Sequence, residues 1–250
     1  MQSGFLRKKN VVNVINKESA GFFIYALIVI AGLFQAQRLY EAVPAFAMPV
    51  SKRVVLIDAG HGGWDPGKVS GKVQEKDINL EIARKLQTYL ELGGATVIVT
   101  RFDDDDVART KSSDMYKRKM TSNTSQADIF VSIHQNSFDG ASVRGAQVFY
   151  FNRSDSSKRL AECIQSTIKD NLIANNRFEA KPNDNYYVLK QTSMPAVLVE
   201  CGFLSNSNDK YMLTQDEYQE KMAWSIYMGI VAYFDGVGLK EIKQDPEFLP

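Results

Sequence analysis

The chain has 250 residues, of which 44% are hydrophobic and 24% charged, and this composition excludes a disordered, collagen-like or low-complexity protein. The formal net charge of +1 argues against nucleic-acid binding, because no broad positive field surrounds the molecule. Two cysteines, Cys163 and Cys201, are too few for a disulfide framework or a four-thiolate zinc site, although one bridge is arithmetically possible. We therefore expect one folded domain that depends on its hydrophobic core.

The N-terminal region has the pattern of a membrane-targeting segment. The basic cluster Arg7–Lys9 precedes a stretch without charge from Ser19 to Gln37, which as a helix would be about 28 Å long, enough to span a bilayer once. We expect a cytoplasmic segment over residues 1–19, a signal peptide or membrane anchor over 20–37, and a linker over 38–50. The small residues Ala45 and Ala47 lie farther from the apolar run than a cleavage site normally does, which favours an uncleaved anchor.

Short apolar runs alternate with amphipathic stretches after this linker. The runs predicted to be strands are Val54–Asp58, Thr96–Thr100, Asp128–His134, Ala146–Phe151 and Ala196–Glu200. Helical spacing of apolar residues predicts helices over 78–90, 115–125, 160–172 and 222–234. The alternation predicts an α/β fold, in which a mostly parallel central sheet carries helices on both faces. We expect this domain to cover residues 51–236, with a tail over 237–250, and the aspartate run Asp103–Asp106 to lie in a solvated loop.

The two histidines of the chain each follow a predicted buried strand. His61 comes after the run VVLID, and His134 ends the run DIFVSIH. Because ligands of open α/β sheets bind beyond the carboxyl ends of the strands, both imidazoles are candidates for a functional site. Two neutral imidazoles and one carboxylate can hold a catalytic zinc ion and leave one position for water. No HExxH motif occurs, so the ligands of such a site must come from separate strands and loops.

Two glutamates are candidates for the carboxylate chemistry. Glu75 lies just ahead of the first predicted helix, where an acidic residue also interacts favourably with the helix dipole. Glu200 ends the apolar run MPAVLVE, where a carboxylate is either the partner of a buried arginine or a group whose pKa is raised for proton transfer. Zinc beside a glutamate that accepts and returns a proton would hydrolyse an amide. Spacing alone leaves these alternatives open.

Five blocks of the sequence carry a family resemblance: IDAGHGGWDPG, EKDINL, VIVTR, ADIFVSIHQNS and MPAVLVECGFLSN. In this order they resemble the zinc-dependent N-acetylmuramoyl-L-alanine amidases of catalytic type 3, from about Val54 to about Phe234. The resemblance implies a three-layer α/β/α fold with a central sheet of about six strands. One departure is Ala59, which stands where the family often has proline before GHGG. The aspartate run Asp103–Asp106 is also peculiar to this chain, and its role stays open at this point.

The resemblance also assigns roles to single residues. It implies one Zn²⁺ ion bound by His61, Glu75 and His134, a catalytic Glu200, and substrate positioning by Asn136 and Arg118. The implied reaction is cleavage of the amide bond between the lactyl group of N-acetylmuramic acid and L-alanine in peptidoglycan. Cys201 is expected to be a small packing residue, because no histidine lies beside it in sequence.

The short chain without a repeat module is most similar to the sporulation and germination type of amidase. That type strips stem peptides in the spore cortex so that muramic-δ-lactam can form. The alternatives are a vegetative autolysin, a non-catalytic wall-binding protein, and a carboxypeptidase or deacetylase that uses the same metal. We expect peptidoglycan as substrate, no nucleic acid, membrane attachment through the N-terminal segment, and an unidentified activator or targeting protein. The expected location is extracytoplasmic, which in a sporulating cell is the space between the forespore membranes.

Overall fold

The computed structural model describes residue 21 and residues 25–32, 48–105 and 107–236. The chain divides into two units, 1–46 and 47–250, which are described separately here. In the first unit, residues 25–32 are helical and mostly exposed. Among the residues that the structure describes, no helix is long and apolar enough to cross a membrane. Half of the predicted anchor over 20–37, and the whole tail over 237–250, lie outside the described residues, so the predicted division of the chain stays a prediction.

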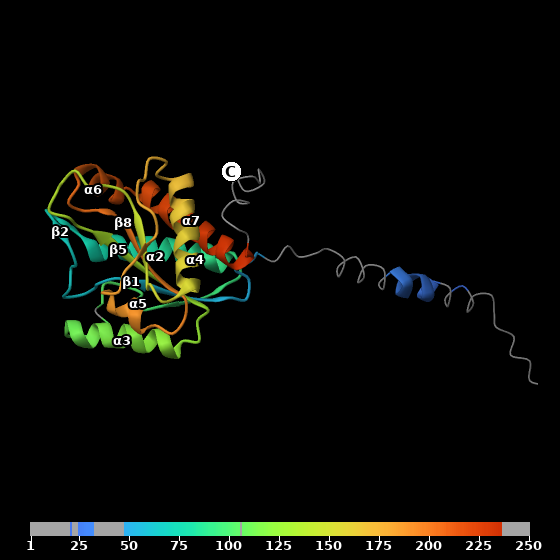
Figure 1. Ribbon diagram of the computed structural model, residues 1–250. Helices are drawn as coiled ribbons and strands as arrows, with labels where there is room; N and C mark the ends of the chain where they lie inside the picture. Colours follow the sequence, from blue (N-terminus) through green and yellow to red (C-terminus); the bar gives the residue numbers. More distant parts are fainter. Residues whose placement is uncertain (1–20, 22–24, 33–47, 106, 237–250) are drawn as a thin grey trace, which may run out of the picture. The chain divides into compact units, whose positions relative to one another are not determined.

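A six-stranded sheet forms the centre of the second unit, in the order β4-β1-β5-β8-β6-β7 (Figure 1). Its strands are β1 (Val54–Ala59), β4 (Thr96–Val99), β5 (Ile129–Asn136), β6 (Gln147–Tyr150), β7 (Lys181–Pro182) and β8 (Ala196–Phe203). Neighbouring strands are parallel except β6 and β8, which are antiparallel. The predicted mostly parallel sheet of about six strands is therefore confirmed. The sequence analysis did not predict three strands of two residues each. These are the edge strand β7 and the strands β2 (Val69–Ser70) and β3 (Val73–Gln74), which form a small hairpin.

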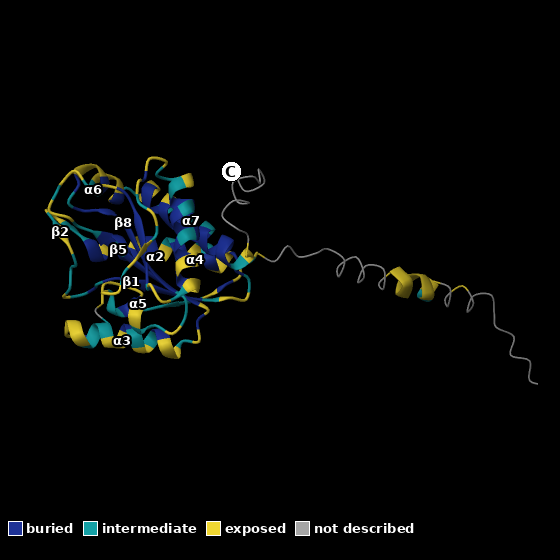
Figure 2. Cartoon of the chain, in the orientation of Figure 1, coloured by how far each residue is buried: buried dark blue, intermediate teal, exposed yellow. Residues whose placement is uncertain are grey.

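Helices cover both faces of this sheet, which makes the three layers (Figure 1). The helices are α2 (Glu75–Leu92), α3 (Lys111–Thr124), α4 (Asp155–Asn171), α5 (Tyr187–Gln191), α6 (Ser207–Leu213) and α7 (Asp216–Asp235). Alternation along β1 assigns its side chains to two cores, because successive residues of a strand point to opposite faces. Val55 and Ile57 join the larger core with α2, α4 and α7, and Leu56 joins the smaller core with α5. Figure 2 shows the sheet dark blue between helices whose outer sides are teal or yellow.

Helix boundaries differ from the sequence prediction where the first turn is polar. Helix α3 begins at Lys111, four residues before the predicted start, because Thr110 and Ser113 form a reciprocal capping box. Glu75 is the first residue of α2 rather than a residue ahead of it. Helices α5 and α6 were not predicted, since five and seven residues are too few to show a helical period.

Candidate metal centre and active site

The four predicted chemical residues come from four separate segments that meet at one edge of the sheet. His61 follows β1, Glu75 begins α2, and His134 and Glu200 lie near the ends of β5 and β8. Strands β1, β5 and β8 are parallel neighbours, so their carboxyl ends lie together. His134 and Glu200 are direct register partners across β5 and β8. The topology therefore places these side chains where ligands of open α/β sheets bind.

His61, Glu75 and His134 form a compact cluster that could hold a metal ion. One ligand atom from each residue lies within 4.8 Å of the other two. Glu75 Oε1 is 3.3 Å from His61 Nε2 and 2.9 Å from His134 Nδ1. The Glu75 side chain is buried, whereas each histidine side chain is 20% exposed, so one side of the cluster is open. Two imidazole nitrogens and a carboxylate oxygen with an open side fit a catalytic zinc site.

Neighbouring groups fix the orientation of the first histidine. Asp65 Oδ2 lies 2.8 Å from His61 Nδ1, so Nδ1–H donates to the carboxylate and Nε2 is left facing Glu75. A carboxylate behind a ligating histidine is a common outer partner in metal sites. The sequence analysis missed Asp65, although its position four residues after His61 in HGGWD was a signal that could have been used.

Glu75 is held by backbone donors on both of its oxygens. Oε2 accepts the N–H of Lys68 at 2.8 Å, and Oε1 accepts the N–H of Gln135 at 3.0 Å. Burial by itself would raise the pKa of Glu75, but hydrogen bonds from His134 and His61 lower it well below its usual range. Burial would lower the pKa of His61, but Glu75 and Asp65 raise it to about 9. Without a metal, His61 is therefore protonated near neutral pH, and a bound cation would displace this proton.

Two glycines allow the close approach of these groups. A Cβ on Gly60 would lie 2.2 Å from His134 Cε1, and one on Gly67 would lie 2.6 Å from Glu75 Oε2. Gly67 also has a φ of 65°, in the left-handed region that favours glycine. His61 itself has a φ of 61°, which is unusual for a residue with a side chain and occurs at functional sites.

Glu200 lies beside the cluster in a different environment. It is 6% exposed, its Oε1 accepts a hydrogen bond from the Tyr186 hydroxyl at 3.2 Å, and its Oε2 has no partner among the described residues. Burial raises the pKa of Glu200 to about 7, aided by the charge of Glu75 and opposed by His134. The sequence had left open whether a buried arginine pairs with this carboxylate, and no arginine does so in the described part of the chain. A glutamate with this pKa can both accept and donate a proton near neutral pH.

Tyr186 is a second residue that the sequence analysis missed. It precedes the short helix α5, in a polar stretch whose sequence carries no helical or strand period. Next to Glu200, the thiol of Cys201 is fully buried and burial raises its pKa, which makes it a poor nucleophile. Cys163 and Cys201 are both free, so the arithmetically possible bridge is absent.

The structure places the two predicted substrate-positioning residues differently. Arg118 is buried, forms ion pairs with Asp58 and Asp114, and donates to the carbonyls of Ala59 and His61. Its hydrogen-bonding capacity is thus largely used to support the turn that carries His61. Asn136 is half-buried at the end of β5, and its Oδ1 accepts the N–H of Ser137 at 2.7 Å. A direct contact of Arg118 or Asn136 with substrate stays a prediction.

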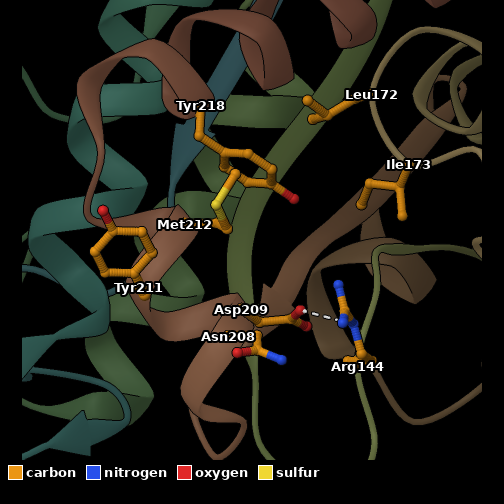
Figure 3. A pocket seen from close by; sticks show the side chains of 8 residues that line it. All are labelled: Arg144, Leu172, Ile173, Asn208, Asp209, Tyr211, Met212 and Tyr218. Atoms are coloured by element: carbon orange, nitrogen blue, oxygen red, sulfur yellow. Dashed lines mark ion pairs between the residues drawn. The ribbon is translucent and has the colours of Figure 1, made fainter.

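A cavity of about 330 Å³ is lined by none of the four predicted chemical residues (Figure 3). Its lining residues are Arg144, Leu172, Ile173, Asn208, Asp209, Tyr211, Met212 and Tyr218. At its wall, the Arg144 guanidinium lies 3.7 Å from the buried Asp209 carboxylate, which also accepts the backbone N–H of Gly145. Both charges of this pair therefore have partners within the protein.

Comparison with known proteins decides the family. The sequence model of the Amidase_3 family, N-acetylmuramoyl-L-alanine amidase, matches residues 55–232. The chain belongs to this family. Its activity is that of an N-acetylmuramoyl-L-alanine amidase, and the predicted resemblance is confirmed. The cluster of His61, Glu75 and His134 is consistent with the metal site typical of this family's zinc amidases. As a cell-wall amidase, the protein acts outside the cytoplasm.

Three relatives illustrate the similarity. The germination-specific N-acetylmuramoyl-L-alanine amidase of Bacillus subtilis is 36% identical over 86% of this chain and 94% of its own length. The CwlD amidase of Clostridioides difficile, solved in complex with the GerS lipoprotein, is 41% identical over 74% of this chain and 100% of its own, with a TM-score of 0.72. The N-acetylmuramoyl-L-alanine amidase of Clostridium difficile 630 is 36% identical over 75% of this chain and 100% of its own, with a TM-score of 0.68.

Proposed function

We propose that this amidase is zinc-dependent, that His61, Glu75 and His134 hold the ion, and that Glu200 is the catalytic acid and base. The observation that carries the proposal is the convergence of three ligand atoms within 4.8 Å beside a buried glutamate with one unpartnered oxygen. The scissile bond is the amide between the lactyl group of N-acetylmuramic acid and L-alanine in peptidoglycan. Zinc held by these three residues would polarise a carbonyl oxygen and would lower the pKa of a water.

The side chains of the protein perform the proton transfers. Glu200 Oε2, which is without a partner in the described part of the chain, accepts a proton from the attacking water and returns it to the leaving nitrogen of L-alanine. The Tyr186 hydroxyl holds Oε1, so that the carboxylate presents the other oxygen. Asp65 keeps the His61 ring in its tautomer, and the N–H groups of Lys68 and Gln135 keep Glu75 in place.

We further propose that the enzyme removes stem peptides in the spore cortex, which permits muramic-δ-lactam formation and later germination. Support comes from the germination-specific relative of Bacillus subtilis, which matches this chain over nearly the full length of both. A vegetative autolysin of the same chemistry is the second candidate, because membership of the amidase family does not by itself assign the cortex role. Muropeptide analysis of cortex from a deletion strain separates the two, since loss of muramic-δ-lactam is expected only for the cortex role.

Attachment and partners belong to the same proposal. The uncharged segment over residues 20–37 would, as an uncleaved anchor, hold the catalytic domain, residues 51–236, at the outer face of the membrane. As a cleaved signal peptide it would only direct the export of this domain. The structure of CwlD of Clostridioides difficile was solved with the GerS lipoprotein, which supports a lipoprotein as the expected activator or targeting partner. In a sporulating cell, the enzyme and such a partner would meet between the forespore membranes.

The test of the reaction is the identity of the product. The full-length protein in detergent is incubated with purified peptidoglycan, with zinc and with a chelator, and the released fragments are analysed by mass spectrometry. We expect free stem peptides that begin with L-alanine, and only in the presence of zinc. Release of single amino acids or acetate would instead indicate a carboxypeptidase or a deacetylase. Intact wall with zinc bound and the partner present would indicate a non-catalytic wall-binding protein.

A further inference from the structure

The turn that carries His61 is contacted by the aspartate run that follows β4. The N–H of Gly63, two residues after His61, donates to the backbone oxygen of Asp104 at 2.7 Å and to its carboxylate at 3.3 Å. A Cβ on Gly62 would lie 2.6 Å from the backbone oxygen of Asp105. Asp104 and Asp105 of the aspartate run therefore pack directly on the turn that carries His61, and this part of the run is not simply a solvated loop.

Lys76 connects this contact to the helix that carries the second ligand. It follows Glu75 in α2 and is 8% exposed. Its Nζ donates to the carbonyl of Gly63 at 2.9 Å and to Asp104 Oδ2 at 2.6 Å. One nearly buried ammonium group thus joins α2, the turn and the aspartate run, next to Glu75 in the chain.

Arg101 reinforces the same junction from the end of β4. It is buried, and its guanidinium donates to the carbonyls of Ala59 and Gly60 in the turn and to the carbonyl of Lys76 in α2. Lys76 and Arg101 are therefore two cationic side chains that join the turn to the start of α2. Because these contacts use charged donors, each is stronger than a neutral hydrogen bond.

The distance between His61 Nε2 and Glu75 Oε1, 3.3 Å, depends on how the turn lies against α2. His61 has a left-handed backbone, a conformation that persists only where the surroundings enforce it. A metal site requires its ligands to be held within about 0.5 Å of the productive geometry by outer contacts. Here Lys76 and Asp104 bridge the two segments beside their ligands.

We propose that Lys76 and Asp104 are positioning residues that hold the His61 turn against α2 and thereby set the metal affinity of the cluster. This gives one member of the aspartate run, Asp104, a function that its neighbour Asp105 does not share. The inference rests on the proposed metal site. It requires that loss of the bridge weakens metal binding in a protein that is still folded.

The experiment measures zinc affinity of the full-length protein in detergent, by competition with a chromogenic chelator. For Lys76→Met we expect a dissociation constant about 10–100-fold higher than that of the wild type, the usual cost of losing an outer contact of a metal site. Asp104→Asn should cost less, because Lys76 still donates to the carbonyl of Gly63 in that variant. The double variant should bind zinc no more weakly than Lys76→Met, since both changes break the same bridge between Lys76 and Asp104. Lys76→Arg, which keeps charge and donors, should lie closer to the wild type.

Asp105→Asn is the matched control, because it removes the same charge one residue along from an exposed position. It should leave the dissociation constant unchanged. Circular dichroism confirms that each variant is folded at the temperature used, and the absorption spectrum of the cobalt-substituted protein reports ligand geometry.

A folded Lys76→Met with wild-type affinity and cobalt spectrum overturns the inference, as does an equal loss in Asp105→Asn. If Lys76→Met does not fold, Asp104→Asn decides: a loss of zinc affinity that Asp105→Asn does not show supports the inference, and wild-type affinity overturns it. If the wild type binds no zinc, the proposed function is contradicted as well. If the wild type binds zinc normally, the variants test the inference alone.

Discussion

Replacement of Glu200 by glutamine should slow turnover strongly, keep the metal and stabilise the metal-free protein. Glu200 Oε2 has no partner in the described part of the chain, and Glu200 is not one of the three clustered ligand residues. Loss of a general acid and base costs about 10²–10⁴-fold in rate. Glu200→Gln should therefore lower kcat by this factor, while its dissociation constant for zinc stays close to that of the wild type.

The stability change follows from the raised pKa of the same carboxyl group. In the folded, metal-free protein the pKa of Glu200 rises from 4.5 to about 7, chiefly because the group is buried. The folded state then binds more protons than the unfolded state between these pH values, so the free energy of unfolding falls as the pH rises through this window. The loss amounts to about 3 kcal/mol and is complete above pH 7. Glutamine cannot ionise, so the variant avoids this loss, less the cost of an amide NH₂ without an acceptor.

The assay is urea unfolding of wild type and Glu200→Gln with chelator present, at several pH values from 4 to 8. We expect the variant to be more stable at pH 8 by up to about 3 kcal/mol, with the advantage disappearing below pH 4.5. The reasoning is refuted if the two proteins show the same pH dependence. Loss of zinc together with activity would instead make Glu200 a ligand.

Three further predictions concern single side chains. Asp65→Ala removes the acceptor of His61 Nδ1–H, so zinc affinity should fall about 10–100-fold in the chelator competition, and an unchanged affinity would contradict the role of Asp65. Tyr186→Phe removes a hydrogen bond that lowers the pKa of Glu200, so the acid limb of the pH profile of kcat should move to higher pH, and an unmoved limb would argue against this contact in the working enzyme. Phe130→Ala empties a fully buried position in the smaller core, so the free energy of unfolding should fall by about 3–5 kcal/mol in urea titrations, and a loss below 1 kcal/mol would mean that the core refills the space.

The sequence was sufficient to predict the sheet, and the candidate site residues were selected from signals that are equally local. Buried parallel strands are continuous apolar runs, and in the structure residues 55–58 of β1 and 129–133 of β5 are buried throughout. The histidines stood out because both follow such runs, and strand ends converge in this class of fold. The exact partners could not be predicted, since Asp65, Tyr186 and Lys76 act through contacts that depend on how loops fold over the sheet edge.

The aspartate run and Arg118 also have contacts with residues far away in the sequence, which the sequence alone could not predict. A run of acids without period is correctly assigned to a loop, but only the fold reveals that Lys76 reaches Asp104 across 28 positions of the chain. Arg118 was expected to position substrate, and the sequence around it does not contradict this expectation. The structure places it beneath the His61 turn with Asp58, a contact between residues 60 positions apart.

Strand β8 comes last along the chain but lies in the middle of the sheet, between β5 and β6. A polypeptide is synthesised from its N-terminus, so β5 and β6 have no common neighbour until Ala196–Phe203 has followed them. The same strand brings Glu200 beside His134, its register partner, and so beside the cluster with His61 and Glu75. The four candidate residues therefore cannot lie together until synthesis has passed residue 200, four fifths of the way along the chain.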